Sequence, residues 1–299
     1  MNASRCIVSR LLAALTLLGL ARCAREEAPR PAAARVERSA SEAGALHDAA
    51  LPPGAAVLPL AAPPRAEAPA FQTLAPGLSV LADRRTDAEG HEHEWLVTRI
   101  DLQQHRLQAR ALGDAPFARL LDEAGVLVAV NGGFFAPNLE PSGLLLSGGS
   151  LLGRARSGGG SGVLAVAEQR ARLLKRGEAL PEGADFAVQC GPRLIEPGGA
   201  LGIHSDDGQR AARTAACIRE AGRELDLIVT LRKGHLGGGP GLLQLAQWLA
   251  GPLAPGDASG CEAALNLDGG PSTGVVVAGR PELVRLPLGP VPFALLVAH

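Results

Sequence analysis

Short apolar runs bounded by glycine, proline and polar residues fill the chain from about residue 71 to its last residue. Runs of this length with such boundaries are typical of β-strands, whereas helices show a longer apolar period of 3.6 residues. The pattern predicts strands at 78–81, 95–102, 106–112, 126–130, 162–167, 186–190, 211–218, 225–231, 263–267, 274–278 and 291–297. It predicts helices only at about 117–124 and 242–250.

Strands outnumber helices too strongly for a fold of alternating strands and helices. We therefore expect an α+β fold with a mixed central β-sheet of many short strands and a few covering helices. Residues 71–299 are enough for one large domain with a sizeable core, so a single domain is expected.

The first 70 residues have a different pattern. Residues 1–23 combine Arg5 and Arg10 with a short apolar segment, which is typical of a secretion signal. Cys23 suits a bacterial lipoprotein attached to a membrane, but Arg22 stands where such signals carry a small residue, so ordinary cleavage stays open. Residues 24–70 are rich in Ala, Pro, Arg and Glu, which predicts a disordered tether. An exported protein follows, whether periplasmic, secreted or an outer-membrane lipoprotein.

Composition restricts the ligand. The net charge is −1, with 29 basic and 30 acidic residues, which leaves no electrostatic footprint for nucleic acid. Aromatic residues make up 3% and tyrosine is absent, so a sugar site here would depend on hydrogen bonds and charge rather than on ring stacking.

The cysteines and histidines give little sign of a metal. Cys190, Cys217 and Cys261 lie on or beside apolar strands, where we expect buried thiols rather than a disulfide. No CxxC motif or Cys/His cluster is present, so no metal ion or other cofactor is expected. Metal binding by His91 and His93 is an alternative to the simpler interpretation, the exposed polar start of a strand.

Two apolar runs end in the same chemistry. The run 263–267 leads through Asn266 into Asp268 and two glycines, and the run 126–130 leads into Asn131 and two glycines. Glycine supplies positive φ or close backbone approach to a ligand, and loops held by a rigid sheet often carry function. We expect the two strand ends to share one pocket, although a simple turn is the alternative for each.

Seven motifs in order make the chain similar to the phosphodiester glycosidase family over roughly residues 78–298. They are NGGFF at 131–135, PxGL at 141–144, SGV at 161–163, QCGPRL at 189–194, RTA at 213–215, NLDGG at 266–270 and VPFAL at 291–295. The resemblance implies a compact α+β domain that hydrolyses the sugar C1–O bond of a sugar-1-phosphodiester, of N-acetylglucosamine type, in a glycan or glycolipid.

That reaction needs little help from a general acid, because its leaving group is a phosphate. Most glycosidases use two carboxylates, one of which protonates the leaving oxygen. A departing phosphate needs this proton less, because its second pKa is about 6. One carboxylate acting as nucleophile or base, with cations on the phosphate, would suffice. The motifs supply one carboxylate, Asp268, and two guanidiniums, Arg193 and Arg213, which bind phosphate oxygens in bidentate fashion.

The candidates follow from these motifs. Catalysis is assigned to Asp268, Arg213 and Glu140, and substrate binding to Asn131, Gly132, Gly133, Arg193, Thr214, Asn266, Gly269, Gly270, Ser272 and Thr273; no residue is assigned to a metal. Glu140 is included because its loop follows the NGGFF segment.

Purely structural roles are the alternative for several candidates. For Arg193 and Arg213 the alternative is a structural ion pair with Asp206, Asp207 or Asp268. For Ser272 and Thr273 it is turn-forming and strand-capping hydrogen bonds. At the level of the whole protein, the alternative to an enzyme is a non-catalytic envelope module that binds polysaccharide or assists exopolysaccharide assembly. A metal-dependent phosphodiesterase is disfavoured because the dense Asp/His clusters of a two-metal site are missing.

Overall fold

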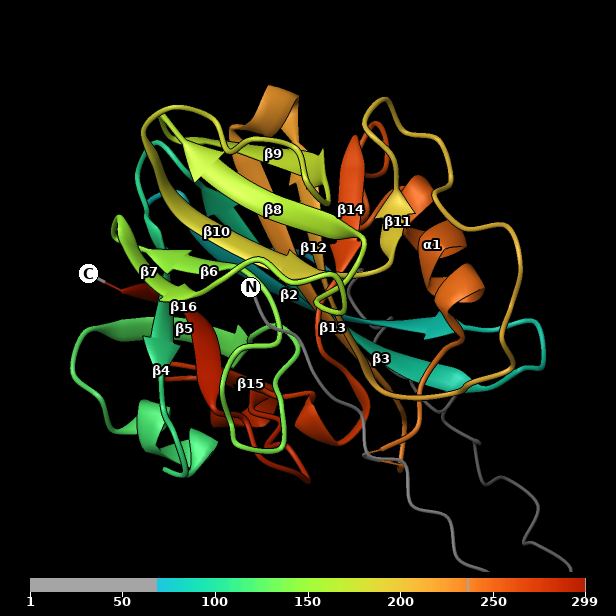
Figure 1. Ribbon diagram of the computed structural model, residues 1–299. Helices are drawn as coiled ribbons and strands as arrows, with labels where there is room; N and C mark the ends of the chain where they lie inside the picture. The colour runs from blue at the N-terminus through green and yellow to red at the C-terminus, as the bar shows by residue number, and fades with distance from the viewer. Residues whose placement is uncertain (1–68, 236, 299) are drawn as a thin grey trace, which may run out of the picture. The chain divides into compact units, whose positions relative to one another are not determined.

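The structure is a computed structural model that describes residues 69–235 and 237–298. The predicted signal at 1–23 and nearly all of the predicted tether at 24–70 lie outside the described residues. Within the described part, sixteen strands form three antiparallel sheets with one α-helix and four short 3-10 helices (Figure 1). None of these helices is long and apolar enough to cross a membrane.

The largest sheet has seven strands in the order β1-β2-β3-β13-β12-β14-β11. Their bounds are β1 Gln72–Ala75, β2 Leu78–Thr86, β3 Glu92–Asp101, β13 Glu224–Arg232, β12 Arg213–Arg219, β14 Ala263–Asn266 and β11 Arg193–Ile195. One helix, α1 (Leu242–Ala250), is attached to this sheet and has the bounds that the sequence predicts.

Two smaller sheets complete the fold. The five-stranded sheet runs in the order β7 Ser150–Gly153, β6 Leu145–Ser147, β10 Ala184–Cys190, β8 Gly162–Ala167 and β9 Arg170–Lys175, and the four-stranded sheet in the order β15 Val275–Val277, β5 Val126–Asn131, β16 Phe293–Ala298 and β4 Leu107–Ala111. The 3-10 helices are η1 Phe117–Leu121, η2 Glu220–Gly222, η3 Gly270–Ser272 and η4 Pro281–Leu283.

The predicted fold class is wrong. All strand pairs among the described residues are antiparallel, so the sheets are not mixed, and the fold is β-rich rather than α+β with several covering helices. The expected helix at 117–124 is only the five-residue η1. Apolar runs report that a strand is buried but carry no information on the direction of its neighbours. Five short or half-exposed strands (β1, β6, β7, β9 and β11) were also not predicted.

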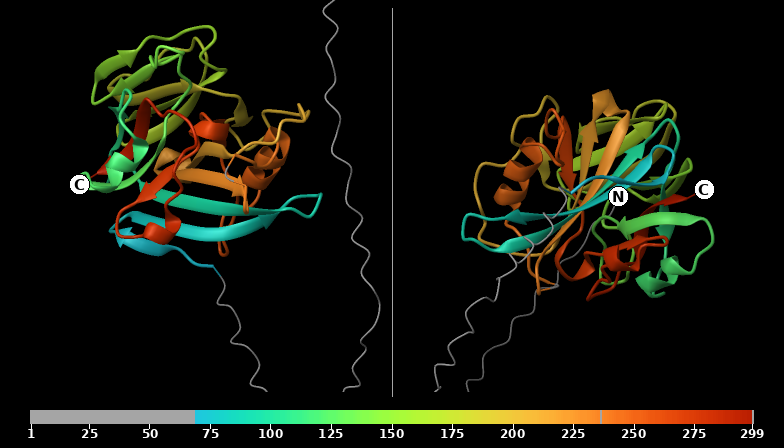
Figure 2. Two further views of the ribbon diagram at one scale, coloured as in Figure 1. Left: turned by 90° about the horizontal axis from the view of Figure 1, so that it is seen from below. Right: turned by 180° about the vertical axis from the view of Figure 1, so that it is seen from behind.

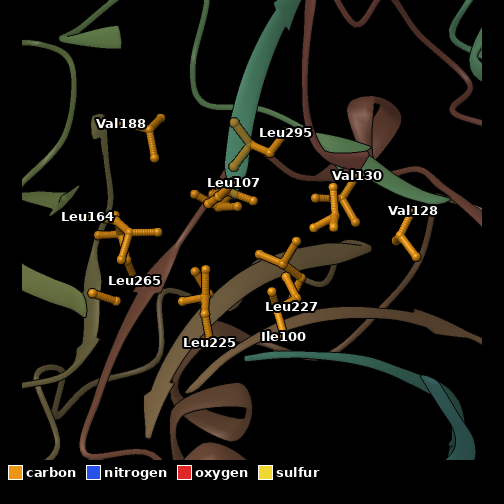
Figure 3. Close-up of a cluster of buried hydrophobic side chains, with 14 of the residues drawn as sticks. Ile100, Leu107, Val128, Val130, Leu164, Val188, Leu225, Leu227, Leu265 and Leu295 are labelled. Atoms are coloured by element: carbon orange, nitrogen blue, oxygen red, sulfur yellow. The ribbon is translucent and has the colours of Figure 1, made fainter. Parts of the chain in front are cut away.

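The main core lies where the three sheets face one another (Figure 3). Leu225 and Leu227 of β13 pack there with Val128 of β5, Leu295 of β16 and Leu164 of β8. Successive side chains of a strand point to opposite faces, so each sheet contributes every second residue. This core joins the sheets into one rigid unit.

The opposite face of the seven-stranded sheet packs against α1. Ile228, which lies between Leu227 and Val229 in β13, belongs to this second core with Leu245 and Leu249 of the helix. The helix and the four-stranded sheet therefore lie on opposite sides of the seven-stranded sheet (Figures 1 and 2). Burial on both faces agrees with the pattern of β13, in which residues 225–231 are all buried and five of these seven are apolar.

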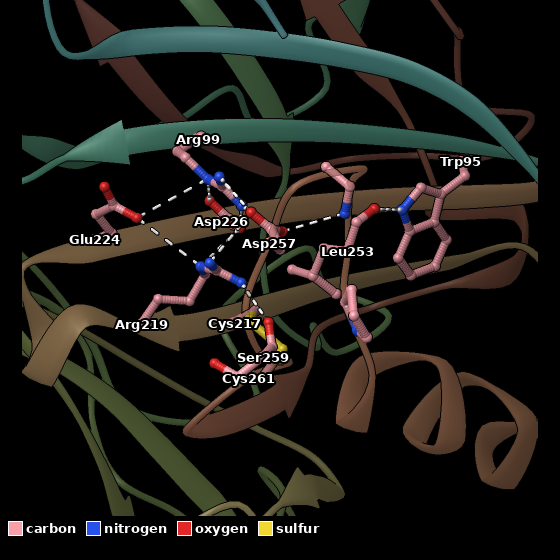
Figure 4. A network of polar contacts seen from close by, with 12 residues as sticks. Trp95, Arg99, Cys217, Arg219, Glu224, Asp226, Leu253, Asp257, Ser259 and Cys261 are labelled. Atoms are coloured by element: carbon pink, nitrogen blue, oxygen red, sulfur yellow. Dashed lines mark hydrogen bonds and ion pairs between the residues drawn. A yellow bond between two sulfur atoms is a disulfide. The ribbon is translucent and has the colours of Figure 1, made fainter. Parts of the chain in front are cut away.

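A buried charge network fastens the segment after α1 to this sheet (Figure 4). The Arg99 guanidinium binds Asp226 (Nε to Oδ1 3.0 Å, Nη2 to Oδ2 2.9 Å) and Asp257 (Nη1 to Oδ1 3.0 Å). Arg219 adds contacts to Asp257 at 3.3 Å and to the Ser259 carbonyl at 3.0 Å. The Arg99 guanidinium thus satisfies both oxygens of Asp226, and the Arg219 Nε lies 3.8 Å from its Oδ2. Asp226 is fully buried, and burial raises its pKa to about 6 while the two guanidiniums oppose the rise.

Beside this network, Cys217 and Cys261 form a disulfide with a Cα–Cα distance of 5.4 Å (Figure 4). The expectation of buried thiols is wrong for this pair and right for Cys190, which is a buried free thiol. The pairing depends on register: Cys217 of β12 lies opposite Ala264 of β14, which brings Cys261 within reach. The two cysteines are 44 residues apart in the sequence, so the sequence alone does not indicate that they are neighbours.

Candidate functional site

The two glycine-rich strand ends meet, as the sequence predicts. Asn131 ends β5 in the four-stranded sheet, and Asp268 follows β14 in the seven-stranded sheet. The Asn131 Nδ2 donates to the Asp268 carbonyl at 2.8 Å, and the Asp268 N–H donates to the Gly132 carbonyl at 3.2 Å. The end of β10, at Cys190, borders the same place, because a Cβ on Gly133 would lie 3.9 Å from the Cys190 Sγ. All three sheets thus contribute one strand end.

Asn131 is the centre of this junction. It is 1% exposed, and its Oδ1 accepts hydrogen bonds from the Thr214 hydroxyl at 2.6 Å and from the Gly274 N–H at 3.2 Å. With the bond to Asp268, both ends of its amide are used inside the protein. Asn131 and Thr214 therefore hold the strand ends together and position the Asp268 loop.

Asp268 carries the partly exposed carboxyl of the junction. Its Oδ1 accepts the Gly269 N–H at 2.9 Å, and the carboxyl also accepts a hydrogen bond from the Ser272 hydroxyl. Burial raises the pKa of Asp268 above its usual range, and these two hydrogen bonds partly offset the rise. The side chain is only partly buried, so a carboxyl with a raised pKa is accessible from outside.

Arg213 opens β12 directly below this loop. Its guanidinium is 8% exposed and donates to two main-chain carbonyls, from Nε to Pro240 at 3.2 Å and from Nη2 to Gln209 at 3.0 Å. Among the described residues it forms no ion pair, and burial lowers its pKa while Asp207 and Asp206 oppose that effect. A Cβ on Gly269 would lie 3.8 Å from the Arg213 Cδ, which places the arginine against the Asp268 loop.

Asn266 is the other buried amide of the site. Its Nδ2 donates to the Gly191 carbonyl at 3.0 Å and to the Leu267 carbonyl at 2.7 Å. Its Oδ1 has no hydrogen-bond partner among the described residues, and neither has the hydroxyl of Thr273. A buried polar atom without a partner is costly. Asn266 Oδ1 and Thr273 Oγ1 are two buried polar atoms of the junction whose hydrogen-bonding capacity no described residue uses.

The glycines of both motifs have packing reasons. A Cβ on Gly132 would lie 2.5 Å from the Phe293 ring, and one on Gly133 would lie 3.0 Å from Val188. Gly270 has φ +59°, in the left-handed region. Close strand approach and this turn account for these three glycines without a ligand.

Two predicted residues contact groups other than Asp268. Arg193 forms an ion pair with Glu196 (Nη2 to Oε1 2.8 Å) and donates to the Ser161 carbonyl at 3.1 Å. It therefore has a structural ion pair, as the alternative interpretation expects, but its partner is not one of the three expected aspartates. Glu140 is exposed and lines a separate cavity with Arg154 and Arg156.

Sequence reasoning missed Gln189 and the setting of Cys190. The Gln189 amide bonds the main chain of Leu144 (3.1 Å) and Arg156 (3.2 and 2.7 Å), and so fixes two loops beside the site. Burial raises the pKa of the Cys190 thiol to about 12, and the charge of Asp268 adds to the rise. The sequence did contain a sign of this role, because Gln189 is a polar residue at the end of the apolar run 186–190.

A β-rich fold with one accessible carboxyl and a buried guanidinium at a junction of three sheets agrees with a hydrolase site. The model of the phosphodiester glycosidase family matches residues 124–298, and the chain belongs to this family. It is therefore a hydrolase, a glycosidase that acts on phosphodiester-linked sugars.

One solved structure supports the fold. The zebrafish N-acetylglucosamine-1-phosphodiester alpha-N-acetylglucosaminidase catalytic domain, auto-inhibited by its pro-peptide, is 19% identical with a TM-score of 0.53, over 78% of this chain and 87% of that chain. A putative exported protein from Burkholderia pseudomallei is 15% identical with a TM-score of 0.46, over 70% of this chain and 75% of that chain. No curated protein matches the chain significantly.

Proposed function

We propose that this glycosidase hydrolyses the C1–O bond of a sugar-1-phosphodiester, of N-acetylglucosamine type, in a glycan or glycolipid, with Asp268 as the catalytic carboxylate. The observation that carries the proposal is the convergence of three strand ends on one accessible carboxyl, held through its main chain by Asn131 and Gly132. Catalytic groups act best when rigid elements fix them, and here two sheets fix one loop.

In the proposed reaction, water adds to C1 while the C1–O bond to phosphate breaks. Asp268 either attacks C1, forming an ester that water then hydrolyses, or accepts a proton from the attacking water. The electron pair of the broken bond leaves with the phosphate, which is stable as an anion because its second pKa is about 6. Both routes need Asp268 to be ionised. In most glycosidases the distance between two catalytic carboxyls distinguishes the two routes. That criterion does not apply here, because Asp268 is the one carboxyl that the proposal uses.

Arg213 is proposed to hold the departing phosphate. A guanidinium has five N–H donors, and the two bonds to main-chain carbonyls occupy Nε and one donor of Nη2. The positive charge has no carboxylate partner among the residues described, so a bound phosphate would supply the missing anion. Asn266 Oδ1 and Thr273 Oγ1 are proposed to accept or share hydrogen bonds with the sugar hydroxyls or acetamido group.

Export is the proposed setting. The signal-like segment at 1–23 and the Ala/Pro-rich segment at 24–70 support an envelope or secreted glycosidase, with Cys23 as the proposed point of lipid attachment if cleavage falls before it. Mass spectrometry of the mature N-terminus distinguishes a lipidated Cys23 from an ordinary cleaved end.

The test incubates the full-length protein with an α-N-acetylglucosamine-1-phosphodiester and separates free sugar from sugar-1-phosphate. We expect free sugar from the wild type and a loss of at least about 10²-fold in kcat for Asp268→Asn, because the isosteric amide keeps the loop bonds but can neither attack nor accept a proton. Asp114→Asn, a charge-matched change at an exposed residue, should retain full activity.

Three outcomes would contradict the proposal. Full activity in a folded Asp268→Asn variant would remove Asp268 from the mechanism. Sugar-1-phosphate as the product would mean cleavage of the P–O bond. Loss of activity with a chelator, restored by metal, would mean that hydrolysis depends on a metal ion rather than on Asp268 and Arg213.

A further inference from the structure

A cluster of ligand-type side chains lies in the hairpin between β2 and β3. One carboxylate oxygen of Asp87, one of Glu89 and one ring nitrogen of His91 all lie within 4.8 Å of one another. The turn itself is closed by main-chain bonds between Asp87 and His91 (3.1 Å) and between Gly90 and Asp87 (3.1 Å). Alternate residues of a tight hairpin thus present three potential ligands on one side.

One distance inside the cluster matches the spacing of two ligands on a single ion, and the other two pairs lie within 4.8 Å. His91 Nδ1 lies 3.2 Å from Asp87 Oδ2. Two ligands that are each about 2.0–2.1 Å from a tetrahedral Zn²⁺ are separated by about 3.3 Å, so this pair needs almost no rearrangement. The exposed Glu89 carboxylate has no hydrogen bond or ion pair with any described residue and is free to complete the set.

An independent observation comes from His93 on β3. This residue is 1% exposed, and its Nε2 lies 2.8 Å from the same Asp87 Oδ2. Its other ring nitrogen, Nδ1, has no hydrogen-bond partner among the described residues, so Asp87 is the only polar group that holds this buried ring. Metal-ligating carboxylates are commonly fixed by such an outer hydrogen bond.

The cluster also faces open space. Asp87, Glu89, His91 and His93 line a cavity of about 650 Å³, whose far wall includes the loop after β13. A metal ion held by three protein ligands there would keep at least one coordination position open toward the cavity.

We propose that Asp87, Glu89 and His91 form a binding site for a divalent transition metal ion, with Zn²⁺ as the best match, and that His93 positions Asp87. One imidazole with two carboxylates favours Zn²⁺ over Ca²⁺, which prefers oxygen ligands alone. The sequence offered metal binding by His91 and His93 only as an alternative, because three ligands from one short hairpin do not resemble a zinc-finger spacing.

This site is separate from the proposed glycosidase centre. It lies at the same end of the seven-stranded sheet, but β13 and β12 stand between β3 and β14, and the two sites share no residue. The metal proposal therefore stands or falls independently of the role of Asp268.

The test titrates Zn²⁺ into metal-free, full-length protein without a polyhistidine tag, using isothermal titration calorimetry. We expect one equivalent to bind, Asp87→Asn and His91→Ala to lose binding, and Glu89→Gln to weaken it at least about tenfold. Glu182→Gln, the same charge change at an exposed residue between β9 and β10, should leave the affinity unchanged. Ca²⁺ should bind at least about tenfold more weakly than Zn²⁺.

Glu89→Gln is the decisive variant. The Glu89 side chain forms no hydrogen bond or ion pair with any described residue, so the substitution should not disturb folding. Equal Zn²⁺ affinity in Glu89→Gln and wild type would overturn the site, as would the absence of any binding. Tighter binding of Ca²⁺ than of Zn²⁺ would overturn the choice of metal class.

Discussion

Asn131 begins a motif that resembles a ligand-binding loop, yet its amide is occupied by the protein itself. Its three bonds, to Thr214, Gly274 and the Asp268 carbonyl, tie two sheets together. Asn266 is different, because one of its polar atoms stays unpaired. The two asparagines that begin the glycine-rich motifs therefore differ. Asn131 positions the Asp268 loop, whereas Asn266 keeps one polar atom without a partner among the described residues.

The raised pKa of Asp268 has a consequence for the pH dependence of activity. A carboxylate that attacks or accepts a proton works only when ionised, so kcat/KM should rise with pH through the pKa of Asp268. Because burial raises that pKa, we expect the acid limb of the profile above the usual value of about 3.9.

Ser272→Ala provides the sharper measurement. Its hydroxyl stabilises the ionised Asp268, so its removal should move the acid limb to higher pH. Thr273→Ala removes a neighbouring hydroxyl that has no protein partner and should leave the limb in place. A shift to lower pH in Ser272→Ala, or the same shift in both variants, would contradict the assignment.

At the scale of elements, the glycine run 158–160 contacts the end of β10. A Cβ on Gly160 would lie 2.0 Å from the Cys190 carbonyl oxygen, and its φ is +112°, whereas a Cβ on Gly158 would meet nothing within 4 Å. Each strand end at the site depends on such close approach. The run is therefore a packing element beside the site.

Gly160→Ala should lower the free energy of unfolding by about 3 kcal/mol or more, since both the contact and the backbone conformation oppose a side chain. Gly158→Ala should change it by less than about 0.5 kcal/mol. Urea unfolding of both variants measures the difference. Equal stability of the two would show that the loop adjusts freely around Cys190.

At the scale of the whole molecule, the Cys217–Cys261 disulfide and the Arg99 network attach the segment containing α1 to the seven-stranded sheet. The disulfide closes a loop of 44 residues in the unfolded chain. By the chain-entropy relation, a loop of this size contributes about 4 kcal/mol of stability. The Asp257 carboxylate, which also accepts the Ala254 N–H at 3.1 Å, fixes the same segment independently.

Reduction should therefore lower the melting temperature of the wild type, while the Cys217→Ala/Cys261→Ala double variant should melt at the same temperature with and without reductant. Cys190 is a buried free thiol, so it takes no part in this disulfide. An unchanged melting temperature of the wild type on verified reduction would mean that the ion network and core alone hold the segment.

Local features of the sequence determined much of this protein. The apolar runs placed most long strands and all of α1, because burial on one or both faces leaves a periodic pattern in any short segment. The ordered motifs identified the family and brought Asn131 and Asp268 to attention, because tight turns and strand ends need particular residues wherever they occur.

Tertiary structure decided what depends on partners distant in the chain. Strand direction, the Cys217–Cys261 pairing and the Arg99–Asp226 ion pair follow from which segments become neighbours, and a local pattern carries no record of that. The same holds for the amide of Asn131, whose partners come from β12 and the loop after β14. Residue type sets what a side chain can bind, and only the assembled sheets determine what it meets.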